Sequence, residues 1–484
     1  MDCSKFVFEN AISRKAYNKA IKAKAKFIKK FGDDTDAVYH LAPKEAPVIG
    51  KKLGVKNTVI SKKSSCNFDD KSIIIGNIRM GFGHYRISMA IASAAHAMGY
   101  TPYWFDLHSF KEASCGKIIA QQNELYSLGS RLSQRFSLFN RLVWEPLNSE
   151  GFRKLTYNSS DQKTAELMTA VFRELPRDIP YVATHVWPSQ AAVHAGLTHV
   201  VNAIPDNWPM GLHLSEGAIH TVQTPSSYLG YRALRGMDKK RQLKPMPKDA
   251  IIYTGHYIDH ELVSNIEPDC QKRIDRANNQ KPVRWLMSVG GAGAQKEIFI
   301  AVIRKLLPAI KAKKAVLFIN VGDHSNVWQE LVAAVPQMKP LMHENFDDFG
   351  ETTSFCEQVY GGEVKGIHAF CHSDIFAAVY STNLLMRCSD VLITKPSELA
   401  FYPVPKLMIK RVGGHEAWGA VRAAEIGDGT YECSTPAETA AMIDMIQHGR
   451  DIIEKMCGYI LAAKKAGIYD GAYRAVELAV GKNK

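Results

Sequence analysis

The sequence has no CxxC pair and no long uninterrupted apolar run. Its nine cysteines stand singly along 484 residues. An odd number of scattered cysteines argues against a disulfide scaffold, and the lack of CxxC argues against a structural zinc site. No window approaches the roughly 18 apolar residues of a membrane span, and the opening residues MDCSKFVFEN lack the apolar core of a signal peptide. We therefore expect a cytoplasmic protein, soluble or peripherally bound, that holds no metal.

The two common phosphate-binding motifs are also missing. No glycine loop has the GxGxxG spacing, and none ends in the Lys-Ser/Thr pair of a P-loop. Lys and Arg outnumber Asp and Glu by 61 to 48, a net charge of +13. This excess favours an anionic partner, such as a phosphorylated substrate or an acidic membrane surface. Because no nucleic-acid-binding motif accompanies the charge, we expect no nucleic-acid partner.

A strand, a glycine turn and a helix follow one another in the middle of the chain. Val283–Val289 is apolar, Gly290, Gly291 and Gly293 come next, and residues 298–310 place apolar side chains at helical spacing. Such a turn can offer backbone N–H groups to a phosphate at a helix N-terminus. It can equally be a tight turn with no ligand, and the pattern alone leaves both interpretations open.

Strand and helix patterns alternate from residue 71 onward, which predicts an α/β fold with parallel sheets in two similar halves. The predicted strands are Ser72–Asn77, Thr101–Leu107, Tyr181–Thr184, Thr198–Ile204, Ile219–Gln223 and Ile251–Tyr253 in the first half, and Val283–Val289, Ala315–Val321, Gly366–Phe370, Val391–Thr394 and Leu407–Lys410 in the second. The expected division is a basic, partly helical extension (1–65), a first domain (66–263), a linker (264–282), a second domain (283–450) and C-terminal helices (451–484).

The N-terminal extension contains one basic amphipathic stretch, Phe8–Phe31. Apolar residues such as Ile12 and Phe27 fall near one face, and lysines crowd the rest. A helix of this kind can lie on an anionic bilayer. The alternative is an ordinary surface helix packed on the first domain.

Short motifs in the first half resemble those of the family 28 glycosyltransferases, especially the galactolipid and diglucosyldiacylglycerol synthases. The stretch NIRMGFGHYRISMAIASAAHAMGY resembles their first glycine loop and helix, with Gly81, Gly83, His84 and Ser88 at the matching positions. The likeness continues in register at His185 with Pro188, Ile204-Pro205-Asp206, Thr224-Pro225-Ser226 and Thr254-Gly255-His256.

The second half resembles the same family, including the peptidoglycan N-acetylglucosaminyltransferase. SVGGAGAQ (288–295) is similar to the loop that holds the donor phosphates. Ser397–Ala400 with Val404–Lys406 resembles a Ser-Glu-Ile-Ala…Leu-Pro segment, and His415–Ala420 resembles Gln-Gln-Tyr-Trp-Asn-Ala. Two departures stand out: Phe82 replaces a usual glycine, and a second glycine loop is cut to Lys395-Pro396.

The resemblance implies a GT-B fold, in which two Rossmann-like domains with parallel sheets face a central cleft. It implies an enzyme that transfers a hexose, with inversion, from a nucleotide sugar to a lipid or membrane-associated acceptor. UDP-hexose is the expected donor, and no cofactor or metal is required. The second domain would hold the donor and the first domain the acceptor.

The resemblance also assigns roles to residues. His84 would be the base that takes the acceptor proton, since its pKa is ordinarily near neutrality, and Asp206 would orient it or share its role. Their alternatives are a packing histidine and a turn-forming aspartate. The donor-binding residues implied are Gly290, Gly291, Gly293, Phe370 (through its backbone), Lys395, Glu398, His415 and Glu416. The acceptor-side loop implied comprises Gly81, Phe82, Gly83 and His185.

Two other functions remain open at this stage. One is a nucleotide-sugar epimerase of the same fold, which needs more acid–base groups than the motifs supply. The other is a catalytically inactive GT-B-like binding or scaffold protein, which the shortened Lys395-Pro396 loop favours.

Overall fold

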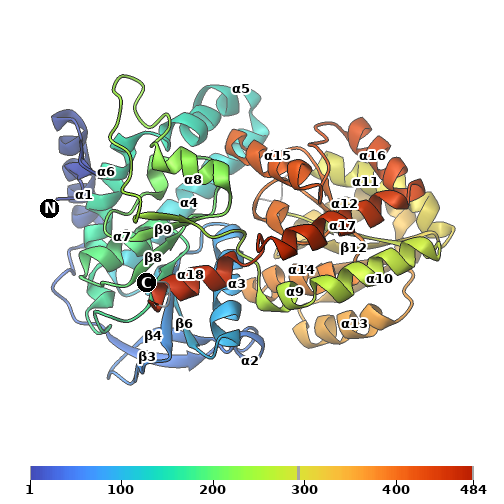
Figure 1. The fold of residues 1–484 in the computed structure, drawn as a ribbon, viewed down its shortest axis with the longest axis horizontal. Coiled ribbons are helices and arrows are strands. Elements are labelled where there is room, and N and C mark those ends of the chain that lie inside the picture. Colours follow the sequence, from blue (N-terminus) through green and yellow to red (C-terminus); the bar gives the residue numbers. More distant parts are fainter. Residues whose placement is uncertain (1, 291–294, 482–484) are drawn as a thin grey trace. The chain divides into compact units, whose positions relative to one another are not determined.

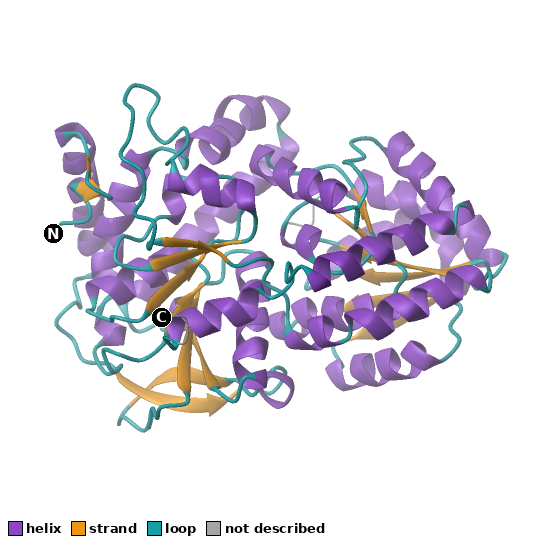
Figure 2. Ribbon diagram, in the orientation of Figure 1, coloured by secondary structure: helices purple, strands orange, loops and turns teal. Residues whose placement is uncertain are grey.

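Two β-sheets, one mainly and one entirely parallel, organise the chain, and the computed structural model describes residues 2–290 and 295–481. The residues form two compact units. Unit 1 comprises Met1–His260, Gly413–His415 and Asp470–Lys484, and unit 2 comprises Glu261–Val412 and Glu416–Tyr469. Helices lie on both sides of each sheet (Figures 1 and 2). The predicted α/β fold with two parallel-sheet halves is therefore confirmed.

The sheet of unit 1 has eight strands in the order β10-β9-β8-β7-β5-β6-β4-β3. Six of them match the predicted strands: β5 (Ser72–Asn77), β6 (Thr101–Asp106), β7 (Tyr181–Ala183), β8 (Val200–Ala203), β9 (Ile219–Val222) and β10 (Ile251–Tyr253). All pairings among these six are parallel. Their carboxyl ends therefore share one edge of the sheet.

The other two strands, β3 (His40–Glu45) and β4 (Lys56–Ser61), lie in the N-terminal extension and were not predicted. They pair antiparallel with each other, and β4 joins the sheet beside β6. The sequence HLAPKE of β3 is mostly exposed and contains Pro43, as edge strands tolerate. Residues 1–65 are therefore partly helical and, beyond what the sequence indicated, also complete a sheet edge.

Helix α1 (Arg14–Phe31) begins later than the predicted start at Phe8, because Ser13 caps it and Phe8 lies in the short hairpin of β1 (Phe6–Val7) and β2 (Asn10–Ala11). It packs along α6 (Leu155–Ala165), and its phenylalanines at 27 and 31 contact the core of unit 1. The apolar side of α1 is thus occupied by protein contacts.

The sheet of unit 2 is six-stranded and entirely parallel, in the order β13-β14-β12-β11-β15-β16. The strands are β11 (Val283–Ser288), β12 (Ala315–Asn320), β13 (Met342–Phe346), β14 (Gly366–Cys371), β15 (Val391–Thr394) and β16 (Lys406–Met408). Only β13 was not predicted. Its sequence MHENF is polar and half-exposed because it forms the sheet edge.

The helices alternate with these strands as the pattern predicted. In unit 1 they are α2 (Gly50–Leu53), α3 (Gly83–Ala97), α4 (Ser114–Arg135), α5 (Ser137–Phe139), α7 (Val186–His194) and α8 (Pro225–Arg232), with π-helical turns η2 (Asn140–Trp144) and η3 (Leu147–Gly151). In unit 2 they include α11 (Lys296–Lys311), α12 (Ser325–Ala334), α13 (Phe349–Gly361), α14 (Ile375–Cys388), α15 (Ala417–Ile426), α16 (Pro436–His448) and α17 (Asp451–Lys465).

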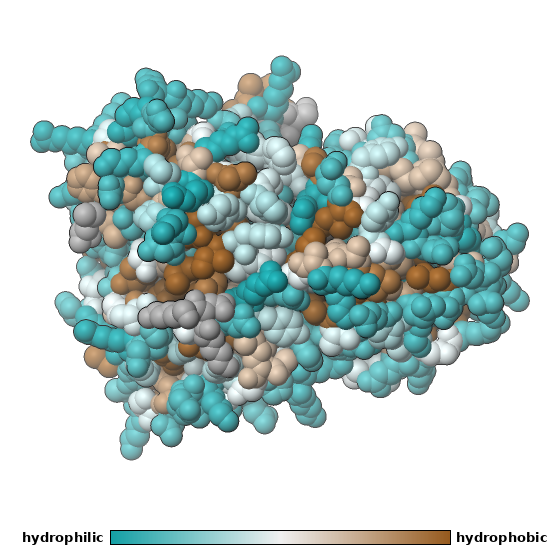
Figure 3. Space-filling model, in the orientation of Figure 1, coloured by the Kyte–Doolittle hydropathy of each residue, from teal (hydrophilic) through white to brown (hydrophobic). Residues whose placement is uncertain are grey.

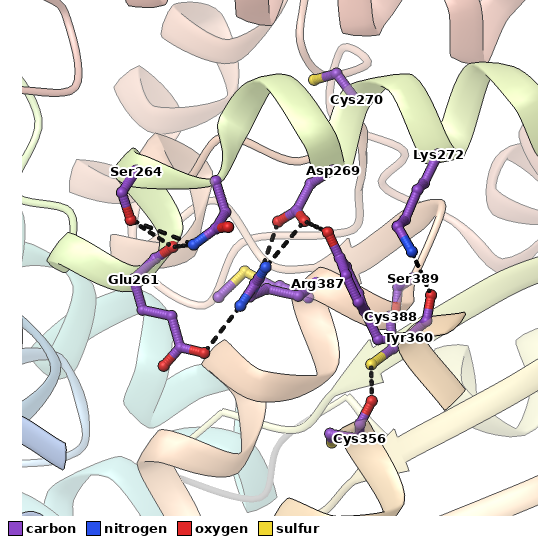
Figure 4. A network of polar contacts seen from close by, with 12 residues as sticks. Glu261, Ser264, Asp269, Cys270, Lys272, Cys356, Tyr360, Arg387, Cys388 and Ser389 are labelled. Carbon is purple, nitrogen blue, oxygen red and sulfur yellow. Dashed lines mark hydrogen bonds and ion pairs between the residues drawn. The ribbon is translucent and has the colours of Figure 1, made fainter. Parts of the chain in front are cut away.

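The segment 264–282, expected to be a linker helix and turn, is largely helical. It contains α10 (Ile266–Asn278), after α9 (His260–Ser264), and α10 packs against α17. Arg387 of α14 holds α9 and α10 in place, with Nη1 3.0 Å from Glu261 and Nε 3.3 Å from the buried Asp269 (Figure 4). These ion pairs make the segment a structural part of unit 2.

The C-terminal helices divide between the units. Helix α17 belongs to unit 2, whereas α18 (Gly471–Ala479) belongs to unit 1 and packs on α3. A Cβ at Gly471 would lie 2.2 Å from the carbonyl oxygen of Gly255, so only glycine fits where α18 begins.

A buried histidine should make the stability of unit 1 depend on pH. His220 donates Nδ1–H to the Ala250 carbonyl (2.9 Å), and its Nε2 accepts from the Ser215 N–H (2.9 Å). Burial lowers the pKa of His220 to about 4. The unfolded chain binds this proton near pH 6.5 and the folded chain does not, so stability should fall by about 2–4 kcal/mol as the pH drops from 6.5 to 4. Urea unfolding of His220→Leu should show a shallower pH dependence.

The matched control is His448→Gln, which alters an exposed histidine. We expect this variant to keep the pH dependence of the wild type. Equal slopes for His220→Leu and wild type would contradict the expectation.

Candidate functional site

The carboxyl ends of β5, β7 and β8 carry the polar residues of the site in unit 1. These strands are parallel neighbours, and ligands of open α/β sheets bind at this edge. The loop after β5 turns at Gly81 (φ +76°) and enters α3 at Gly83. Phe82 is 8% exposed, so this departure from the family pattern packs inward.

His84 is the second residue of α3, and its imidazole has a defined orientation. Its Nδ1 lies 2.7 Å from the carbonyl oxygen of Thr184 at the end of β7. Because a carbonyl only accepts, Nδ1 carries the hydrogen and Nε2 of the neutral ring is the proton acceptor. A histidine held in this tautomer is suited to act as a general base.

His185 lies edge-to-face against His84, with ring centroids 4.9 Å apart. Its Nδ1 accepts from the backbone N–H of Trp187 at 3.2 Å, at the start of α7. Burial, with the nearby His84 as a second cause, lowers the pKa of His185 well below its ordinary value. His185 is therefore neutral near pH 7 and serves as a packing partner of His84.

Asp206, after β8, faces a histidine that the sequence did not single out. Nε2 of the buried His213 lies 3.2 Å from Oδ2 of Asp206, and Nδ1 lies 2.6 Å from the Tyr231 hydroxyl. Burial acts to raise the pKa of Asp206, but the bond from His213 and nearby histidine charges hold it well below its usual range. Asp206 is thus a carboxylate, 35% exposed in its side chain, within a relay of three residues.

The relay extends beyond Asp206 and His213 to a tyrosine. The Tyr231 hydroxyl lies 2.6 Å from Nδ1 of His213 and donates to the carbonyl of Trp208 (3.0 Å). No motif marks His213 or Tyr231, and only the fold brings them to Asp206.

The segment Thr224-Pro225-Ser226, part of the family resemblance, caps a helix. The Thr224 hydroxyl accepts from the Ser227 N–H at 3.1 Å and starts α8. The hydroxyls of Thr224 and Ser227 also donate to the side-chain oxygen of Asn207, the residue after Asp206. The motif therefore supports the loop that carries the aspartate.

In unit 2 the structure brings Gly290, Lys395 and Glu416 together. The first two follow the neighbouring strands β11 and β15, and a Cβ at Gly290 would be 3.0 Å from Cε of Lys395. The Lys395 ammonium pairs with the buried carboxylate of Glu416, which also accepts from the Val412 N–H (2.7 Å). The side chain of Lys395 thus lies beside Gly290, where the glycine loop begins.

The other predicted donor residues are placed less directly. Gly291 and Gly293 lie outside the described residues. Glu398 is half-buried at the start of the turn η8 (Glu398–Phe401). The Phe370 ring is fully buried, so only its backbone is available to a ligand, and His415 is grouped with unit 1.

The short Lys395-Pro396 loop has a packing reason. Helix α15 passes directly over it, and a Cβ at Gly419 would lie 2.4 Å from the Pro396 carbonyl oxygen. A longer glycine loop would collide with this helix. The sequence showed the deletion, and the structure shows what occupies its space.

Metal-binding clusters and membrane-spanning helices are both absent from the described residues. No group of three or more His, Cys, Asp or Glu side chains in them is arranged to hold a metal ion. None of their helices has the length and apolarity that crossing a membrane requires.

Comparisons with known proteins give family matches of unknown function and distant structural likenesses. Residues 6–233 match the model "Domain of unknown function (DUF6937)", and residues 246–480 match "Domain of unknown function (DUF6938)". No curated protein matches the chain.

Three solved structures illustrate the structural likenesses. The UDP-GlcNAc 2-epimerase of Neisseria meningitidis, bound to UDP-GlcNAc, is 13% identical, with a TM-score of 0.43 over 85% of this chain and 100% of its own. A glycosyltransferase of Rickettsia africae ESF-5 is 13% identical, with a TM-score of 0.37 over 85% of this chain and 97% of its own. The α,α-trehalose 6-phosphate synthase of Burkholderia multivorans is 12% identical, with a TM-score of 0.41 over 85% of this chain and 96% of its own.

Proposed function

We propose that this protein is an inverting glycosyltransferase that moves a hexose from a nucleotide sugar, with UDP-hexose the expected donor, to a lipid or membrane-associated acceptor in the cytoplasm. Unit 1 supplies the base and the acceptor site, and unit 2 holds the donor. The observation that carries the proposal is the orientation of His84, whose Nδ1–H donates to Thr184 and leaves Nε2 as the proton acceptor.

The proposed chemistry needs a base and a means to stabilise a charged leaving group. The acceptor hydroxyl attacks the anomeric carbon, its proton passes to Nε2 of His84, and the nucleoside diphosphate leaves. The Asp206 carboxylate lies near enough to interact with the His84 charge and would stabilise the imidazolium that forms. Such a base contributes typically about 10²–10⁴-fold to the rate.

The proposed donor site uses the carboxyl edge of the unit 2 sheet. The diphosphate would lie on the glycine loop that begins at Gly290, with Lys395 as its cation. Lys395 would then exchange its partner Glu416 for the phosphate, or share its charge between them. Glu398 would bind the ribose hydroxyls, and Glu416 the sugar.

The acceptor assignment rests on exposed apolar surface in unit 1. Eight large apolar side chains between residues 125 and 147 are each at least 40% exposed: Leu125, Tyr126, Leu128, Phe136, Leu138, Leu142, Val143 and Leu147. They lie on the second half of α4, at its C-cap Phe136, on α5 and on the π-helical turns that follow. An apolar patch of this extent is typical of lipid or partner contact, and we assign it to the acyl chains of the acceptor and to a membrane surface.

The test is a pair of measurements on the full chain. Calorimetric titration with UDP-glucose, UDP-galactose and UDP-GlcNAc should detect binding of at least one. Release of UDP should then require diacylglycerol in mixed micelles. Absence of binding by every nucleotide sugar would favour a scaffold role.

Replacing Lys395 should weaken donor binding. In Lys395→Met the diphosphate loses a cation and meets the negative charge of Glu416. We expect UDP to bind about 10–100-fold more weakly, as loss of a charged contact implies. Calorimetry measures this directly, and Lys465→Met, which alters an exposed lysine of α17, is the control. Unchanged UDP affinity in Lys395→Met would remove this residue from the site.

A second candidate function, a nucleotide-sugar epimerase, is favoured by one observation. The Asp206–His213 pair adds acid–base groups beyond His84, more than a single proton transfer needs. In deuterated water an epimerase would place deuterium on the recovered sugar without an acceptor, whereas a transferase would release UDP only when acceptor is present.

A further inference from the structure

A cavity of about 430 Å³ opens at the amino edge of the unit 2 sheet. The starts of β11 and β12 form one side, and the ends of α10 and α13 form the other. Because all six strands are parallel, this edge is opposite to the one that carries Gly290 and Lys395. The volume falls in the ~300–1,000 Å³ range of small-molecule sites.

The lining of this cavity is strongly cationic. Six basic side chains and two carboxylates border it, which leaves four positive charges in excess. The cations are Lys272, Arg276, Lys281, Arg284, Lys313 and Lys365, and the carboxylates are Asp275 and Glu363. The surface where α10 ends is correspondingly hydrophilic (Figure 3).

Two arginines in the floor share one buried carboxylate. Arg284 is 7% exposed, and its guanidinium donates to the carbonyls of Val359 (2.8 Å) and Gly362 (2.6 Å). The Asp390 carboxylate pairs with Arg276 (2.8 Å) and accepts from the backbone N–H of Arg284 (2.9 Å). Burial and the charge of Arg276 lower the pKa of Arg284, against the opposing charge of Asp390. Two largely buried guanidinium groups beside one carboxylate leave a positive charge in excess, so this floor favours an anion.

The mouth of the cavity adds two exposed cations. Within the described parts of the chain, the side chains of Lys313 and Lys365 make no hydrogen bond or ion pair, and both residues are exposed. The wall beside them is packed around Tyr360, because Lys272 lies 3.9 Å from the ring centroid of Tyr360 and Arg387 covers the same ring at 4.7 Å (Figure 4). Largely buried guanidinium groups and exposed lysines thus surround one space.

We propose that this cavity is a second ligand site, which binds a small molecule carrying a diphosphate group. The cations form two pairs, Arg276 with Arg284 in the floor and Lys313 with Lys365 at the mouth. Two such pairs suit two linked phosphates better than they suit a single phosphate. A hollow of this volume selects a small molecule rather than the extended backbone of a nucleic acid or a flat membrane. The site lies on the other edge of the sheet from the proposed donor loop and does not depend on it.

The test counts pyrophosphate sites and measures their affinity by calorimetry at about 0.15 M salt, where the Debye length is about 8 Å. The probe is inorganic pyrophosphate, and the background is Lys395→Met, which removes the donor-loop cation. In this background we expect one saturable site per chain. The double variant Lys313→Glu/Lys365→Glu should weaken it by about 30-fold or more, since two charged contacts are reversed.

The matched control is Lys311→Glu/Lys314→Glu, which makes the same change of net charge at exposed lysines outside the lining. It should alter the affinity less than about threefold, because charges that do not contact the ligand are screened at this salt concentration. No saturable binding in the Lys395→Met background, or equal losses in both double variants, would overturn the proposal. The proposal would also be overturned if Lys313→Glu/Lys365→Glu kept its pyrophosphate affinity and lost only its co-sedimentation with phosphatidylserine vesicles. If wild type and Lys395→Met bound the same number of pyrophosphates per chain, the result would instead contradict the proposed phosphate site at the donor loop.

Discussion

Lys406→Met should destabilise unit 2 by about 3–5 kcal/mol, because it leaves a carboxylate buried without its cation. Lys406, in β16, and Asp428 are both essentially inaccessible, and their charged atoms lie 2.8 Å apart. The ammonium also donates to the carbonyls of Tyr402 (2.7 Å) and Val404 (3.1 Å), so all three of its protons are used. Burial lowers the pKa of Lys406 and raises that of Asp428, and each charge opposes the shift of the other.

The measurement is urea unfolding of unit 2, followed through tryptophan fluorescence. The double variant Lys406→Met/Asp428→Asn should recover part of the loss, since no net charge then remains buried. Lys455→Met breaks an ion pair of 3.0 Å that is exposed on α17, and it should cost no more than about 1 kcal/mol. Similar losses for Lys406→Met and Lys455→Met would show that burial does not set the energy of the pair.

His84→Ala should lower turnover by about 10²–10⁴-fold under the proposed function. An acceptor hydroxyl cannot ionise ahead of attack near neutral pH, so its proton must leave as the new bond forms. The variant removes the group whose Nε2 would take that proton. UDP affinity should stay close to that of the wild type, because the proposed donor site is in unit 2.

The control for this variant lies on the same helix. His96→Ala changes an exposed histidine near the C-terminal end of α3, and it should leave turnover near that of the wild type. Asp206→Asn should give an intermediate loss, because it removes the charge that stabilises the imidazolium. Near-normal turnover of His84→Ala would assign the base elsewhere, with Asp206 the next candidate.

The structure brings some of the predicted site residues together. His84, His185 and Asp206 follow neighbouring strands and do lie at one sheet edge, as residues after parallel strands must. Their proposed roles stay predictions. Lys395 and Glu416 were predicted separately as donor residues, and the structure shows them as an ion pair. That contact joins two loops and has no local signature.

The sequence by itself determined the order and extent of the central strands and helices. Buried parallel strands such as β5 and β12 are continuous apolar runs, and the helices between them carry apolar residues at their own period, so local sequence is enough. Only the tertiary structure decided the polar edge strands β3 and β13, the relay of Asp206, His213 and Tyr231, and the cationic cavity of unit 2. Each of these depends on groups distant along the chain that meet only when the sheets form, and side chains so paired leave no periodic pattern to detect.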